Sequence, residues 1–577
     1  MTAAIGERWQ LRRVPRAGLV VALGVGLLLS PDMAAQDAID LRQSVREREQ
    51  LEFQQRLRSL QRQPPRPGLL DAGTALTPLQ SPSGRCWYIQ GLRVTGNRLV
   101  SQARIREALL PQLAPCMDTA QVDQMLATLT ALYAQDGYIA SRPQLRTPPA
   151  DRQALDIVLI AGFVEAVEVS DQSLPLSLRS AFGELLGRPL QLRTLERGLE
   201  QLNRLQSFDL TADIEPGTAI GASRIVIRPQ SRPARWGLGA ALNNAGKPNI
   251  GRHQVQLSAS LDSPLQLNDF IHLSASQTLH AAPGLSRSLG LYYALPYQAW
   301  MLSFNASQSE YRVPLPAEHG RANETHGNST LIGVGLERSL WRDPQRVLSA
   351  TVRLDHKRTE AFLGDQATGI QSPTLLNAEA GLSLLWIQGG IWTGYLGYAR
   401  GLSDWDGGDY LAASPGAPQG HFGKWRGSLG YLGQRQWAGL AWQWHSQSAW
   451  QYSTDALPSI EQQLLTDEYA VRGLRDLSLS GNTAASWRNS LSVKLPLGGG
   501  WTLEPQLGAD LGWRRIEPWQ RNTLEPFAET GRIAAVSAGI ALAERHTRLT
   551  LDYQRSLYLR NAASQPGYWR VELSLKL

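Results

Sequence analysis

The sequence has few cysteines and lacks the long apolar runs of a helical membrane protein. Only 2 of its 577 residues are cysteine, hydrophobic residues make up 42%, and the mean hydropathy is −0.26. Beyond the N-terminus, no apolar run reaches the roughly 20 residues that a membrane-spanning helix needs. A helical membrane protein is therefore excluded. A membrane β-barrel stays possible, because only its outward face must be apolar.

Phenylalanine is also scarce compared with the other aromatic residues. The chain has 9 Phe against 18 Trp and 16 Tyr. Trp and Tyr combine an apolar ring with a polar group, which suits the two membrane interfaces of a barrel. Composition alone leaves a membrane barrel and a soluble all-β protein both open.

The usual signatures of enzymes are missing. We find no G-x-S-x-G elbow, no H-E-x-x-H zinc motif and no G-x-x-x-x-G-K-[ST] phosphate loop. The histidines are mostly isolated, as at His253, His272 and His356. We therefore expect no catalytic residues, no metal and no cofactor. The net charge of +7 comes without a dense basic run, so we expect scattered surface arginines rather than nucleic-acid binding.

The N-terminus predicts an export signal over residues 1–35. A basic region is followed by a short apolar stretch over residues 17–30 and by the small residues Ala34 and Ala35. A core or anchor helix is the alternative. Export leads to an oxidising compartment without ATP, where two cysteines can form a disulfide.

Residues 36–60 predict a helix that is polar on nearly every side. Such a helix cannot pack onto an ordinary core, so it must lie in water, lie in a polar channel or be unstable. Pro64, Pro65 and Pro67 end it, and a linker rich in Gly, Pro, Ser and Thr covers residues 61–84.

Two small α+β modules are predicted next, over residues 85–161 and 162–230. The first has a strand at 87–95, a helix at 101–110, a helix that Asp118 or Thr119 caps, and strands near Gln144 and at 154–160. The second has a strand at 164–169, a helix over 176–186 that ends at Gly187, a helix with Leu195, Leu199 and Leu202 on one face, and closing strands around 214 and 224–227.

From residue 231 to 577 the pattern alternates with period two. Val255, Leu257, Ala259 and Leu261 share one face of a predicted strand, and small polar residues share the other. About sixteen such stretches can be marked, with roughly 21 residues per strand and connection, which fits a membrane barrel. The fold class is thus an antiparallel barrel of about 16 strands behind two α+β modules and an N-terminal helix.

Several motifs occur together in one order along the chain. They are Cys86-Trp87-Tyr88-Ile89, Cys116, Tyr133 with Gly137-Tyr138-Ile139, the run 187–193, Leu202-Asn203-Arg204-Leu205, Leu242-Asn243-Asn244-Ala245-Gly246, Leu267-Asn268-Asp269, Val471-Arg472-Gly473-Leu474 and Gly508-Ala509-Asp510. This set resembles the TpsB transporters of two-partner secretion, the haemolysin secretion/activation family. In that family the two modules are POTRA domains. Leu474 replaces the usual aromatic residue, and Leu577 replaces the usual terminal Phe.

The resemblance implies an outer-membrane pore of a Gram-negative cell with periplasmic POTRA domains. The pore would secrete, without ATP, a large β-helical exoprotein with an N-terminal secretion domain, such as an adhesin, a haemolysin or a contact-dependent toxin. Activation of the exoprotein during secretion stays open. Outer-membrane lipid and the barrel-assembly machinery would be further partners. A barrel-assembly insertase and a ligand-uptake barrel are the alternatives, although an insertase usually has more POTRA domains and an uptake barrel has a globular plug.

The resemblance also implies the roles of particular residues. Cys86 and Cys116 would form a disulfide. Arg472 and Gly473, in the long connection over about 451–485, would fold into the barrel and meet Asp510 and Gly508. Alternation itself predicts that Asp510 points into the lumen, because the other face of its strand is apolar, with Leu507, Ala509, Leu511 and Trp513. The helix at 36–60 would be a plug, a disordered periplasmic tail being the alternative. The POTRA-like modules would bind the partner, and the residues proposed for this are Tyr133, Tyr138, Leu192, Arg193, Asn203 and Arg204.

Overall fold

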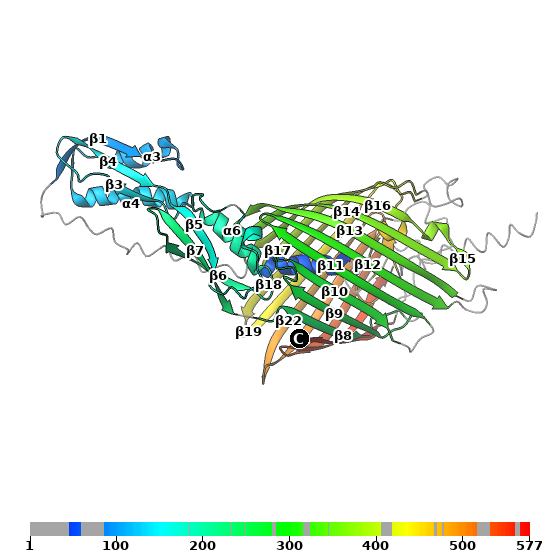
Figure 1. Cartoon of the computed structure of the whole chain (residues 1–577). Helices are drawn as coiled ribbons and strands as arrows, with labels where there is room; N and C mark the ends of the chain where they lie inside the picture. The colour runs from blue at the N-terminus through cyan, green and yellow to red at the C-terminus, as the bar shows by residue number, and fades with distance from the viewer. Residues whose placement is uncertain are drawn as a thin grey trace, which may run out of the picture.

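The computed structural model describes a closed barrel with two small modules at one of its ends (Figure 1). The described residues are 45–58, 86–183, 185–231, 233–247, 250–279, 284–314, 324–343, 345–405, 418–466, 470–475, 478–515, 531–559 and 566–577. The predicted export signal and the predicted linker lie outside them. Among the described residues, no helix is long and apolar enough to cross a membrane.

The first module is a four-stranded sheet in the order β2-β1-β4-β3 with two helices packed on it. Its elements are β1 (Trp87–Thr95), α3 (Gln102–Leu109), η1 (Leu110–Gln112), β2 (Cys116–Met117), α4 (Thr119–Gln135), β3 (Arg142–Leu145) and β4 (Gln153–Ile160). Asp118 caps α4, since its side chain accepts a hydrogen bond from the backbone of Gln121 and the Gln121 side chain accepts one from Asp118 N. The apolar face of this helix is buried, and its residues are Val122, Met125, Leu126, Leu129, Leu132 and Tyr133.

The second module repeats this arrangement with a three-stranded sheet in the order β5-β7-β6. Its elements are β5 (Phe163–Val169), α5 (Leu178–Phe182), α6 (Leu192–Asn203), β6 (Asp209–Pro216) and β7 (Ala222–Ser231). The prediction of a helix over 176–186 was wrong in length. Gly183, with φ of +60°, ends α5 early, because Gln298 N of the barrel donates a hydrogen bond to Ser180 O and holds this segment.

Sixteen long antiparallel strands close the barrel, as the period-two pattern predicted. They are β8 (Trp236–Asn243), β9 (Gln254–Asp262), β10 (Phe270–Thr278), β11 (Leu285–Tyr297), β12 (Trp300–Pro314), β13 (Glu324–Arg342), β14 (Arg346–Leu363), β16 (Thr374–Ile387), β17 (Ile391–Gly401), β18 (Gly423–Trp437), β19 (Leu440–Tyr452), β22 (Ala484–Gly498), β23 (Trp501–Arg514), β24 (Arg532–Ala543), β25 (Thr547–Leu559) and β26 (Tyr568–Lys576). Short elements between them are β15 (Gln366–Ala367), η3 (Gly369–Gln371), η4 (Ser459–Glu461), β20 (Gln463–Leu464) and β21 (Ser480–Gly481).

The two faces of the barrel wall differ as the alternation requires. In β23, Leu507, Leu511 and Trp513 are exposed on the outside, whereas Asp510 on the inside is 1% exposed. The last strand closes the barrel onto β8, and the backbone of Leu577 exchanges hydrogen bonds of 2.9 and 3.2 Å with that of Leu238. Closure leaves no free sheet edge in the hydrocarbon region.

Candidate functional site

The connection between β19 and β22 folds inward and brings Arg472 to Asp510. Arg472 Nη2 lies 2.7 Å from Asp510 Oδ1, and Arg472 Nε lies 2.7 Å from Asp510 Oδ2. The backbone N–H of Arg472 also donates to Oδ2, at 3.0 Å. The carboxylate therefore receives both arms of the guanidinium fork, a geometry that Lys cannot copy.

Two glycines make room for this contact. A Cβ on Gly508 would lie against the Arg472 guanidinium, so a larger residue there would displace this group from Asp510. Gly473 has φ of +81°, and a Cβ there would lie 2.7 Å from the backbone carbon of Arg555. The tip of the loop thus lies directly on the inner wall, over β23 and β25.

The leucine that replaces the usual aromatic residue at this tip is well packed. Leu474 is 6% exposed and lies in an apolar cluster that the loop and the wall build together. The other members of the cluster are Leu465, Val471, Leu479, Ala484, Ile533 and Ala535. Leucine therefore fills this place without an aromatic ring.

A helix over residues 45–58, blue in Figure 1, lies inside the barrel and is held mainly by charged groups. Glu52 Oε2 lies 2.6 Å from Arg353 Nη2, and Arg56 Nη2 lies 2.6 Å from Glu337 Oε2. Nearer its N-terminus, Arg48 Nη1 donates to Asn305 Oδ1 at 2.9 Å. Its polarity on nearly every side, noted in the sequence, is thus matched by a polar wall. The remainder of 36–60 lies outside the described residues.

Sequence reasoning missed a second contact of the inward loop, at Glu461 in η4. The Glu461 carboxylate, 2% exposed, accepts hydrogen bonds from Lys357 Nζ at 2.6 Å, Asn377 Nδ2 at 2.7 Å and Lys424 Nζ at 2.7 Å. The partners lie 104, 84 and 37 residues away along the chain, so no local motif marks them.

The second module is docked on the barrel through the Leu267-Asn268-Asp269 turn. The Asn268 side chain accepts from Ser177 N and donates to Ser177 O, both at 2.8 Å, and donates to Ser180 Oγ at 2.5 Å. Glu200 of α6 pairs with Arg342 of β13, and burial raises the pKa of Glu200 to about 7 although Arg342 lowers it.

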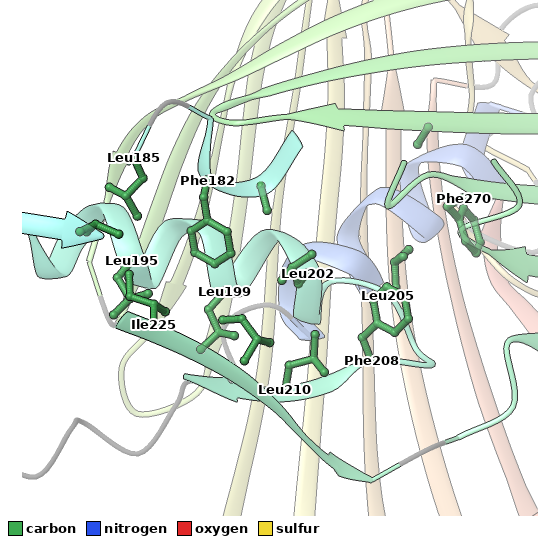
Figure 2. Close-up of a cluster of buried hydrophobic side chains, with 14 of the residues drawn as sticks. Phe182, Leu185, Leu195, Leu199, Leu202, Leu205, Phe208, Leu210, Ile225 and Phe270 are labelled. Carbon is green, nitrogen blue, oxygen red and sulfur yellow. The ribbon is translucent and has the colours of Figure 1, made fainter. Parts of the chain in front are cut away.

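The apolar core of the second module also continues into the barrel. Figure 2 shows α6 residues such as Leu199 and Leu202 in one cluster with Phe270, which belongs to β10. Leu51 of the luminal helix packs against the same cluster. The module, the wall and the helix are therefore one packed unit.

The residues predicted to contact the partner separate into two groups. Three of them are buried. Tyr133 is 1% exposed and donates a hydrogen bond to Asn97 Oδ1 at 2.5 Å, and the Asn203 side chain exchanges two hydrogen bonds of 2.8 Å with the backbone of Leu210. Arg204 is 5% exposed and lies against the barrel. A surface contact is not available to these three, because their side chains already serve the packing. Tyr138, Leu192 and Arg193 are half-buried or exposed.

Cys86 and Cys116 are joined by a disulfide, with their Cα atoms 5.4 Å apart. No group of three or more His, Cys, Asp or Glu within the described ranges could hold a metal ion.

Residues 221–542 match the family described as Haemolysin secretion/activation protein ShlB/FhaC/HecB. Residues 87–162 match the ShlB-type POTRA domain, and residues 163–216 match a second POTRA domain. Over 531 residues, the chain is 33% identical to the Hemolysin transporter protein ShlB of Serratia marcescens, covering 91% of this chain and 90% of that protein. The chain belongs to the haemolysin secretion/activation family.

Other members of the family agree with this. The Hemolysin transporter protein HpmB of Proteus mirabilis is 32% identical, with 74% of this chain and 76% of that protein covered. The fold is that of CdiB from Escherichia coli, with a TM-score of 0.77, 23% identity and coverage of 95% and 99%. The chain is thus an outer-membrane transporter of two-partner secretion with periplasmic POTRA domains, and its function implies a large exoprotein partner.

Proposed function

We propose that this transporter secretes one large β-helical exoprotein, and that its luminal loop and helix hold the pore in a resting state. The observation that supports this most directly is that two of the chain's own segments lie in the lumen, each attached to the wall by buried polar contacts. Haemolysins are the first cargo class to test, because the ShlB and HpmB relatives are named as haemolysin transporters. Adhesins and contact-dependent toxins are the other classes.

The POTRA domains bind the exoprotein before it enters the barrel. The exposed edges β3 and β6 can add an extended chain through backbone hydrogen bonds, a mode that tolerates many sequences. Tyr138 and the N-terminus of α6 lie next to each other, since Leu192 N donates to Gly137 O at 2.8 Å. Together with Arg193, they form an accessible surface at the junction of the two domains.

Co-expression with the candidate exoprotein tests the transport step. We expect the exoprotein in the medium only when the transporter is present, without any periplasmic nucleotide. An exoprotein that stays in the periplasm while the barrel is correctly inserted would contradict the proposed cargo class.

The pair Arg472–Asp510 is proposed to lock the loop tip to the wall. Removing one partner leaves the other charge buried and uncompensated, which costs about 3–5 kcal/mol. We therefore expect secretion to fall sharply in Arg472→Ala and in Asp510→Ala, with barrel levels largely kept. In the double variant, the loss of secretion should be smaller than the sum of the two single losses. If the single losses simply add, the two residues act independently and the proposed lock is wrong.

The helix around residues 45–58 is proposed to act as a plug. Deleting residues 36–60 should leave a folded barrel with higher single-channel conductance in planar bilayers, because a helix about 10 Å wide leaves the lumen. Unchanged conductance would contradict the plug. The proposed domain limits of 1–35, 36–60, 61–84, 85–161, 162–230 and 231–577 guide these deletions.

A further inference from the structure

Three strands on one side of the barrel wall, β14, β16 and β18, hold the inward loop at Glu461, and β17 lies between the last two. The side chains that do so are Lys357 of β14, Asn377 of β16 and Lys424 of β18. Lys424 Nζ also donates to the backbone oxygen of Glu461, at 2.7 Å. The two ammonium groups and the carboxylate form a buried set that is complete only while the loop lies inward.

Two of these strands, β14 and β18, also contact the plug helix, one or two inward-facing positions away from Lys357 and Lys424. On β14, Arg353 binds Glu52 and Asp355 lies 3.6 Å from Arg48. On β18, Arg426 lies 3.4 Å from Glu49 of the helix.

Arg426 also lies 3.2 Å from Glu379, which comes two positions after Asn377 on β16. Alternate residues of a strand share a face and lie about 7 Å apart. The side chains that bind the loop therefore lie within one or two inward-facing positions of Arg353, Asp355 and Arg426, which contact the plug.

The two segments also share an apolar cluster with the wall. Ile460, next to Glu461, is 6% exposed and lies in a cluster with Leu331 and Leu375 of the wall. Val45 of the plug helix packs against this cluster. The loop segment that Glu461 anchors thus contributes to the surface on which the plug rests.

We propose that Glu461 is a positioning residue that couples the inward loop to the plug, so that releasing the loop at this point loosens the plug. Without the carboxylate, the ammonium groups of Lys357 and Lys424 are buried as like charges without compensation. They would draw water in, loosen the apolar cluster against which Val45 packs, and compete with Arg353 and Arg426 for Glu52 and Glu49. This inference rests on the proposed role of the helix as a plug.

Glu461→Gln tests the coupling with little change in shape. In planar bilayers we expect open events to become several-fold more frequent, approaching those of the barrel that lacks residues 36–60. In that plug-deleted barrel, the same substitution should change nothing further. Ile460→Ala, which leaves the charges intact, should act in the same direction more weakly.

Glu504→Gln is the matched control. Glu504 is a largely buried carboxylate inside the same barrel with two cations beside it, Lys494 at 3.9 Å and Arg548 at 2.6 Å, and it has no described contact with the plug or with the loop. It should leave the frequency of opening unchanged. If Glu461→Gln changes the frequency of opening equally with and without the plug, Glu461 only stabilises the wall. If Glu461→Gln has no effect on this frequency in the full chain, the coupling is wrong.

A second readout separates failure of the coupling from failure of the plug. Gln55 of the helix is 5% exposed, so a cysteine in Gln55→Cys should react slowly with a thiol reagent added from the periplasmic side. Glu461→Gln should accelerate this reaction several-fold. If it does while deletion of residues 36–60 leaves conductance unchanged, the coupling stands and the plug role fails. If deletion raises conductance but Glu461→Gln changes neither readout, the coupling is wrong.

Discussion

The two POTRA domains share one topology but are stabilised in different ways. The first has a core of its own, formed by residues between Trp87 and Leu159, together with a disulfide. The core of the second includes Phe270, Tyr292 and Ala294 of the barrel, with Leu51 of the plug helix against it. The first domain meets the second around its turn at 137–141, where Gly162 N donates to Ser141 Oγ. The second domain is therefore fixed to the barrel, whereas the first domain is attached mainly through the second and is the one expected to bind the exoprotein.

Deleting residues 85–161 is the change with the largest expected effect. Because the core of the second domain is anchored on the barrel through Phe270, Tyr292 and Ala294, the barrel should still insert, while secretion of the exoprotein should be abolished. Heat-modifiable migration in gels checks the barrel, and exoprotein in the medium checks secretion. Normal secretion would move capture to the second domain, around Leu192.

Removing the disulfide should destabilise the first domain alone. Its cysteines are 30 residues apart, and closing a loop of that length contributes roughly 3 kcal/mol. In Cys86→Ser/Cys116→Ser, protease should cleave residues 86–160 faster, whereas the second domain and the barrel keep their resistance. Reducing the unsubstituted protein should reproduce the effect. Equal loss of resistance in both domains would contradict their independence.

Asn268→Ala should weaken the docking of the second domain by about 1–3 kcal/mol, since buried partners lose their hydrogen bonds. The expected result is faster proteolysis around α5 without faster proteolysis of the first domain. Asn328→Ala is the control, because Asn328 donates to Glu360 within the barrel wall and does not contact the POTRA domains. Equal sensitivity of both variants would mean that Asn268 serves the barrel rather than the docking.

The sequence predicted the features that depend on a local pattern of residues, such as strands and the direction of their side chains. Alternation predicted the strands and placed Asp510 in the lumen, and two spaced motifs brought Arg472 to it. Tyr133, Asn203 and Arg204 stand in equally recognisable motifs, but a motif does not say whether a residue faces a partner or the interior. The role of Glu461 could not be predicted from the sequence, because it depends on contacts with Lys357, Asn377 and Lys424. Only the folded barrel brings these residues together. The length of α5 depended likewise on a contact with a distant barrel turn.

The smallest expected effect concerns the pH dependence of the docking at Glu200. Burial raises the pKa of this carboxyl from 4.5 to about 7, so the docked state holds the proton more tightly than the undocked state. The resulting stabilisation is fully present below the undocked pKa and is lost as the pH rises through about 7. Docking should therefore be weaker at pH 8 than at pH 5. Glu200→Gln, which resembles the protonated group, should remove the dependence of docking on pH.

Spin labels at two introduced cysteines report the docking as a distance distribution. The positions are Ile220→Cys, at a residue that is 85% exposed, and Ala438→Cys on a barrel turn. A distribution that narrows as the pH rises would mean that the ion pair with Arg342 outweighs burial, and would reverse the prediction.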